Sequence, residues 1–232
     1  MGEPALLPAA NRLSMAPAAA DAMDGFTPDF PIVPRKPFVS VLLIAGSPSA
    51  PSRSTALLEA VGERLARRHA RIERLAIREL PAQALLLADW NHPAIERAIA
   101  QVAQARAIVV ATPVYKAAYS GVLKVFLDLL SQNALKGKTV LPLATGGSPH
   151  HMLALDYALR PVLQSLAARH ILPGVYASDS QIALTPENAY QVHNDLAERL
   201  NEAVEVLATE GLKLPATHGF EPVPFSRVRC SV

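Results

Sequence analysis

The sequence contains little that could crosslink the chain or hold it in a membrane. Cys230 is the one cysteine among 232 residues, which excludes an intrachain disulfide framework and a cysteine-rich zinc site. No run of residues approaches the ~18 uncharged apolar residues that would span a bilayer. The HExxH and CxxC patterns of metal sites are absent too, so we expect no metal site.

An excess of one charge sign is also lacking. The chain has 22 Lys and Arg against 20 Asp and Glu, which gives a formal net charge of +2. A dedicated nucleic-acid-binding protein is not expected, because such proteins usually carry a strong basic excess. Hydrophobic residues make up 50% of the chain, which favours a globular domain over a disordered protein.

The first 37 residues differ in composition from the rest of the chain. They are rich in Ala and Pro and show no steady period, so we expect a disordered or irregular N-terminal extension. A later start at Met15 or Met23 is an alternative. One domain is expected over residues 38–214, followed by a C-terminal tail over residues 215–232. Since the chain shows no secretory signal and carries a single cysteine, we expect a cytoplasmic protein.

Apolar runs and amphipathic periods alternate along the predicted domain. The runs predict buried strands at residues 38–45, 107–112, 139–145 and 171–177, with an edge strand at 71–77. The periods predict helices at residues 52–68, 93–104, 120–130, 152–169 and 186–210. This alternation is typical of an α/β protein with a parallel sheet and helices on both faces. We expect a flavodoxin-like fold, with five parallel strands in the order 2-1-3-4-5.

The loop after the first strand, residues 46–55, has the composition of a phosphate site. It leads into a helix N-terminus, whose free amides and dipole favour an anion. Hydroxyl groups and one arginine add donors, and we expect them to hold a phosphate: Ser47, Ser52, Arg53, Ser54 and Thr55. The P-loop and GxGxxG spacings are absent. The alternative is that a serine here only caps the helix.

Two further loops follow strands at the same edge of the predicted sheet. Residues 112–121 contain two tyrosines and could form a flat wall, although a surface loop or an oligomer contact is the alternative. Residues 144–151 contain Gly146 and Gly147, which let a ligand lie against the backbone. A phosphate and a planar ring together indicate FMN. A dinucleotide in the first loop would call for an acidic residue after the second strand, and strand 71–77 ends without one.

Four runs at these positions resemble the NADPH-dependent FMN reductases, above all those of two-component alkanesulfonate monooxygenase systems. The runs are AGSPSAPSRST, ATPVYKAAYSGVLK, LPLATGGS and LALDYALRPVL, at residues 45–55, 111–124, 141–148 and 153–163. The resemblance implies an oxidoreductase that takes hydride from NADPH and reduces FMN. It also implies that the reduced flavin passes to a partner monooxygenase for alkanesulfonate desulfonation and sulfur acquisition. It implies a tetramer, built as a dimer of dimers.

The resemblance also assigns residues to the flavin. The five residues of the first loop would hold the phosphate, and the ring would lie among Pro113, Val114, Tyr115, Lys116, Ala117, Thr145, Gly146, Gly147 and Ser148. Tyr157 matches a tyrosine that the family associates with a π-helical insertion and with flavin transfer. Ser49 stands where relatives often carry Arg. No side chain is expected to be obligatory for catalysis, because the cofactors carry hydride transfer.

Two other functions remain open on the sequence. One is an FMN-containing quinone or azo reductase that keeps its flavin tightly bound. The other is a flavodoxin-type electron carrier, although such carriers usually present an acidic face, which the net charge of +2 does not favour. The sequence does not decide between NADPH and NADH.

Overall fold

The computed structural model of the chain describes residues 40–185 and 190–213. The expected N-terminal extension, the C-terminal tail and Cys230 lie outside the described residues. Within the described ranges, no helix is both long enough and apolar enough to cross a membrane.

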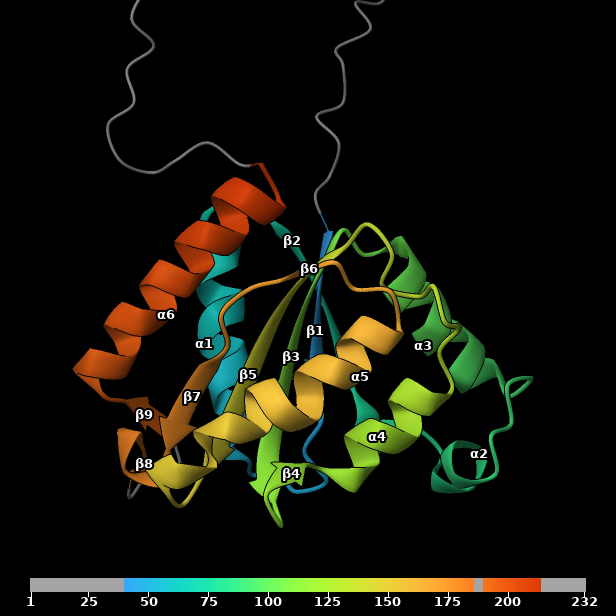
Figure 1. Ribbon diagram of the computed structural model, residues 1–232, viewed down its shortest axis with the longest axis horizontal. Coiled ribbons are helices and arrows are strands. Elements are labelled where there is room, and N and C mark those ends of the chain that lie inside the picture. The colour runs from blue at the N-terminus through green and yellow to red at the C-terminus, as the bar shows by residue number, and fades with distance from the viewer. Residues whose placement is uncertain (1–39, 186–189, 214–232) are drawn as a thin grey trace, which may run out of the picture. The chain divides into compact units, whose positions relative to one another are not determined.

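A parallel sheet forms the centre of the domain (Figure 1). Its main strands are β1 (Ser40–Ala45), β2 (Arg71–Ala76), β3 (Ala107–Tyr115) and β5 (Thr139–Gly146), and the last position holds β6 (His170–Ile171) and β7 (Val175–Ser178). They run in the order β2-β1-β3-β5, with β6 and β7 both pairing with β5. Counted as five positions, the sheet has the predicted order 2-1-3-4-5, so the flavodoxin-like fold is confirmed.

The sheet has seven strands rather than the five that were predicted. The predicted strand at residues 171–177 is wrong as a single element, because it divides at Pro173 and Gly174. Proline cannot donate to the ladder of β5, and a Cβ on Gly174 would lie 3.2 Å from the carbonyl oxygen of Pro142. The seventh strand, β4 (Ala118–Tyr119), pairs antiparallel with the end of β3.

Helices cover both faces of the sheet. Figure 1 shows α1 (Arg53–Arg67) and α6 (Asn194–Val206) on one face, and α3 (Pro93–Gln104), α4 (Gly121–Asp128) and α5 (Arg160–Ser165) on the other. Because successive strand side chains point to opposite faces, β1 contributes Val41 and Leu43 to one buried cluster and Leu42 and Ile44 to the other. The short segments η1 (Ile77–Glu79) and α2 (Ala82–Leu86) fill the connection from β2 to α3.

The predicted helix at residues 152–169 is wrong in form and length. The segment comprises a 3₁₀ turn, η2 (Pro149–Leu153), a π-helix, η3 (Leu155–Leu159), and the short α5. Pro161 lies in the first turn of α5, where its missing N–H is tolerated. The segment stops before residue 169, because the chain turns at Ala167 with a φ of 66°.

The last predicted helix begins too early. A hairpin of β8 (Ile182–Leu184) and β9 (Tyr190–Val192) precedes α6, which starts at Asn194 rather than at residue 186. The short helix η4 (Asp179–Gln181) connects β7 to this hairpin, and a second π-helix, η5 (Leu207–Gly211), ends the described chain. Residues 186–189 lie outside the described residues.

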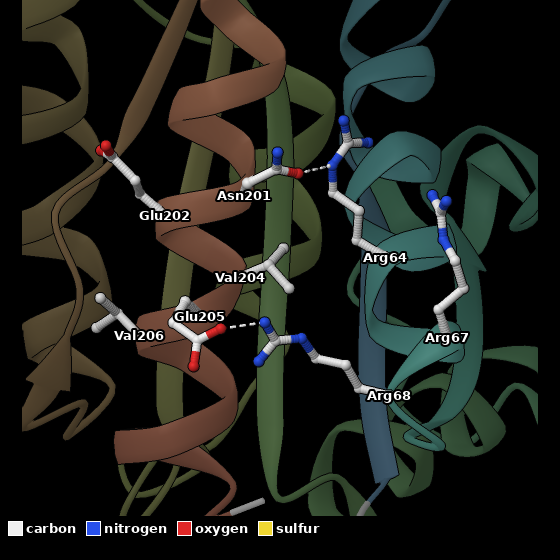
Figure 2. A pocket seen from close by; sticks show the side chains of 8 residues that line it. All are labelled: Arg64, Arg67, Arg68, Asn201, Glu202, Val204, Glu205 and Val206. Carbon is white, nitrogen blue, oxygen red and sulfur yellow. Dashed lines mark hydrogen bonds and ion pairs between the residues drawn. The ribbon is translucent and has the colours of Figure 1, made fainter. Parts of the chain in front are cut away.

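A cavity of about 830 Å³ lies between α1 and α6, at the amino end of the strands. Figure 2 shows Arg64 directed at Asn201 and Arg68 directed at Glu205 across it. Both contacts join residues more than 130 positions apart in the chain. The side chains that line this cavity fasten α6 to α1, and none of the loops predicted to bind a ligand reaches it.

Replacing Glu205 with alanine is expected to lower the free energy of unfolding by about 1–3 kcal/mol. The side chain of Arg68 is 15% exposed, so loss of its carboxylate partner leaves a largely buried charge. Urea denaturation would show a lower midpoint at an unchanged slope. Glu202→Ala is the control, because this carboxylate on the same helix points away from the arginines (Figure 2). Equal midpoints for the two variants would contradict this account.

Candidate functional site

Three loops meet at the carboxyl edge of the sheet, the lower edge in Figure 1. They follow β1, β3 and β5 and surround a cleft of about 210 Å³. Most of the predicted cofactor-binding residues line this cleft: Ser47, Ser52, Arg53, Pro113, Val114, Tyr115, Thr145, Gly146 and Gly147. The edge is the one at which open parallel sheets bind ligands.

The first loop is held in shape by its own hydroxyl groups. Ser47 is 2% exposed, and its Oγ accepts a hydrogen bond from the amide of Ser49 at 3.2 Å. Ser52 is the N-cap of α1 and accepts from the amide of Thr55 at 3.4 Å. The Oγ atoms of Ser52 and the buried Ser54 lie 3.0 Å apart. The N-terminus of α1 therefore lies at the cleft, which Ser52 and Arg53 line.

The charges at the start of α1 suit an anion. The first turn contains no acidic side chain and begins with Arg53. A cation at this end opposes the helix dipole, so an anion bound here would relieve an unfavourable arrangement. The Arg53 guanidinium donates to the carbonyl of Ile182 at 3.2 Å and lies 3.7 Å from the Asp179 carboxylate. These contacts hold it at the cleft while its side chain stays 40% exposed.

The second loop is a two-residue hairpin between β3 and β4. Its central residues, Lys116 and Ala117, have φ values of 50° and 64°. Such a turn usually carries glycine or asparagine, and other residues there store about 1–3 kcal/mol each. Lys116 and Ala117 at the turn of this hairpin do not line the cleft. Pro113, Val114 and Tyr115 precede the turn and do line it.

Buried hydroxyl groups connect the first two loops. The Oγ of Ser120 donates to the carbonyl of Gly46, and the amide of Ser120 donates to the Oγ1 of Thr112 at 2.9 Å. Ser120 also caps α4 by accepting from the amide of Leu123 at 3.2 Å. Ser120 and Thr112 are each 1% exposed. This network fixes the separation between the first loop and the hairpin.

The third loop is held by Tyr176 of β7. Its hydroxyl donates to the carbonyl of Ser148 at 2.6 Å, and burial raises the pKa of this phenol above its usual value. A Cβ on Gly146 would lie 2.6 Å from the same hydroxyl, so glycine is required for close packing there. Ser148 itself does not line the cleft, and its Oγ accepts from the amide of His150 at 3.3 Å.

Several predicted residues therefore lie outside the lining of the cleft. Lys116, Ala117 and Ser148 are placed as described above, Ser54 is buried behind Ser52, and Thr55 lines a neighbouring cavity. Tyr157 lies on η3, so the π-helical segment that the resemblance predicts is present around it. Its side chain is 78% exposed. The described residues include no group of three or more His, Cys, Asp or Glu placed to hold a metal ion.

Four lining residues had not been assigned from the sequence: Ser49, Pro51, Asp179 and Tyr190. Asp179 follows the carboxyl end of β7, and that position was a usable signal. Tyr190 belongs to β9, in a hairpin that the sequence pattern did not predict.

The residues present fit FMN. Helix amides, the buried Ser47 hydroxyl and Arg53 at one side match a phosphate. Backbone at Thr145, Gly146 and Gly147 opposite Pro113 and Tyr115 matches a flat ring. FMN would supply the acceptor for a hydride, and the protein would bind and orient it.

Comparisons with known proteins agree with this geometry. The family model of NADPH-dependent FMN reductase matches residues 39–183. An FMN reductase (NADPH) of Escherichia coli is 47% identical, over 71% of this chain and 86% of the relative. The NADH-dependent FMN reductase SfnE of Pseudomonas putida is 38% identical, over 62% of this chain and 80% of the relative.

A solved structure shows the same relationship. The apo form of an NADH:FMN oxidoreductase is 41% identical, with a TM-score of 0.67, and the match covers 79% of this chain and 92% of that one. The chain therefore belongs to the NADPH-dependent FMN reductase family and is an NAD(P)H-dependent flavin oxidoreductase.

Proposed function

We propose that the chain treats FMN as a substrate, reduces it with NAD(P)H and releases it to a two-component monooxygenase that desulfonates alkanesulfonates. The flavin part of this proposal is supported by the three loops that surround a cleft at the N-terminus of α1, where Arg53 lies. The partner rests on the resemblance of four sequence runs to reductases of such systems. We also propose that the reaction takes place in the cytoplasm, because a chain with a single cysteine suits a reducing compartment.

Each loop has its own role in this function. Ser47, Ser52 and Arg53 bind the phosphate, with the amides of the first turn of α1. Pro113 to Tyr115 and Thr145 to Gly147 bind the ring from two sides. No side chain acts as an acid or a base at the reacting carbon, because hydride passes directly between the two cofactors.

An exposed apolar surface beside the cleft supports an oligomer. Tyr115, Met152, Leu153 and Tyr157 are between 48% and 78% exposed. They lie on the β3–β4 hairpin and on η2 and η3, and β4 packs against η3. Large side chains grouped in this way are typical of a surface that another molecule covers. We propose a dimer of dimers in which this surface is shared and Tyr157 assists flavin transfer.

Titration of FMN into the purified protein with excess NADPH tests the flavin assignment. We expect colourless protein and a rate of NADPH oxidation that rises to saturation with added FMN. Yellow protein that reduces quinones without added FMN would replace the proposal with a quinone or azo reductase. Absence of any NADPH or NADH oxidation would favour an electron carrier. Sulfite release in the presence of an alkanesulfonate monooxygenase then tests the partner.

A further inference from the structure

A second cavity of about 500 Å³ lies directly beside the flavin cleft, on the side of β2. The two cavities share a wall made by Ser49, Pro51, Ser52 and Tyr190. The flavin phosphate accounts for the cleft side of this wall. Flavin binding gives no role to the residues on the other side of this wall. A second ligand that extends from the cleft could therefore occupy the second cavity.

Two arginines face this second cavity, and they differ in how they are paired. Arg74 is held by Glu59: its Nε lies 3.0 Å from both carboxylate oxygens and its Nη2 lies 2.9 Å from one of them. This pairing raises the pKa of Arg74, and the Glu59 carboxylate balances its positive charge. Arg78 lies 3.9 Å from Glu79, which is beyond hydrogen-bond length. Exposed pairs of this kind contribute little, so the guanidinium of Arg78 is available to a ligand.

The position of Arg78 indicates which ligand. It follows the carboxyl end of β2 by two residues, since β2 ends at Ala76. In dinucleotide-binding sheets a residue after the second strand contacts the adenosine ribose while the pyrophosphate occupies the first loop. Here the first loop is assigned to the flavin phosphate, so only the ribose-recognising chemistry at this strand end carries over. An acidic side chain there accepts from a free 2′-hydroxyl, and an arginine accommodates a 2′-phosphate. A guanidinium is matched to a phosphate dianion by charge and by its fork of donors.

We propose that the second cavity binds the adenosine end of NADPH and that Arg78 binds its 2′-phosphate, so that this chain prefers NADPH to NADH. The inference rests on the proposed function, because it needs the nicotinamide to lie over the flavin in the adjoining cleft. Ser49, which has a small side chain, lines both cavities in the shared wall.

Steady-state kinetics with Arg78→Ala test the proposal. Loss of a charge-assisted contact is expected to lower kcat/KM for NADPH by about tenfold to hundredfold. The NADPH-to-NADH ratio of kcat/KM should fall by a similar factor. Arg71→Ala is the matched control, because Arg71 begins the same strand at the opposite edge of the sheet. A parallel loss with both nucleotides, or an unchanged ratio, would overturn the proposal.

A binding measurement separates this inference from the reductase assignment. Calorimetry with adenosine 2′,5′-bisphosphate requires no flavin turnover, and adenosine 5′-phosphate is the reference ligand. We expect the bisphosphate to bind wild type at least tenfold more tightly than the reference, and Arg78→Ala to lose this difference. Equal affinities for the two ligands in wild type would overturn the proposal even if the enzyme reduces FMN. A retained difference with no FMN reduction would uphold it while the proposed function fails.

Discussion

Replacing Arg53 with alanine is expected to raise the KM for FMN by about tenfold to hundredfold. Arg53 is the first residue of α1, where its charge opposes the helix dipole and would be stabilised by a bound phosphate. Hydrogen bonds to charged groups contribute about 1.5–3 kcal/mol, and each 1.4 kcal/mol is a factor of ten in affinity. Initial rates of NADPH oxidation at varied FMN concentration measure the effect.

Riboflavin provides the internal control for this variant, because it has the same ring and no phosphate. The KM for riboflavin should differ little between wild type and Arg53→Ala, so the preference for FMN should fall. Arg67→Ala removes a cation from the other end of the same helix and should leave both values alone. An equal rise of both KM values would instead mean that Arg53 acts by anchoring Ile182 and Asp179. The phosphate assignment would then be wrong.

The elements nearest the sheet centre could be predicted from sequence, because their patterns are simple. The apolar run that contains β1 is continuous since both of its faces are covered, as Leu42 and Leu43 show. The α3 helix has the bounds predicted from its period, because Pro93 starts it and its apolar residues fall on one face. The position of the carboxyl edge of the sheet follows from these elements. The loops that follow β1, β3 and β5 lie together because all three strands end at that edge.

Other features depend on contacts that no local pattern records. The turn at Lys116 and Ala117 adopts left-handed backbone without glycine, so nothing in the sequence signals a hairpin there. The segment at residues 152–169 has a helical period, yet its turns are 3₁₀, π and α in succession. Tyr190 reaches the cleft through the β8–β9 pairing, which joins short strands with weak patterns.

The arginines beside the cleft illustrate the same limit. Arg74 and Arg78 are four positions apart in a basic stretch, and the sequence does not show which of them is available to a ligand. The fold places Glu59 of α1 against Arg74 and leaves Arg78 next to an exposed glutamate. The proposed preference for NADPH therefore rests on a pairing that the fold alone shows.

Replacing Gly146 with alanine is expected to lower the free energy of unfolding by about 1–3 kcal/mol and to reduce kcat/KM for FMN. The new methyl group would lie 2.6 Å from the hydroxyl of Tyr176, too close for the two to coexist unmoved. Displacing that hydroxyl breaks its bond to the carbonyl of Ser148 and frees the third loop. Gly121→Ala is the matched control, because no atom lies within 4 Å of a Cβ at that position.

The Tyr176→Phe substitution identifies the hydroxyl as the cause of this conflict. Alone it removes one hydrogen bond and is expected to cost about 0.5–1.5 kcal/mol. In the double variant the methyl group would face the Cζ of the ring at 3.5 Å, an ordinary contact. The double variant should therefore be less destabilised than the sum of the two singles, by about 1 kcal/mol. Additive losses in urea denaturation would mean that the methyl group acts elsewhere, because coupling requires that both changes meet at the same hydroxyl.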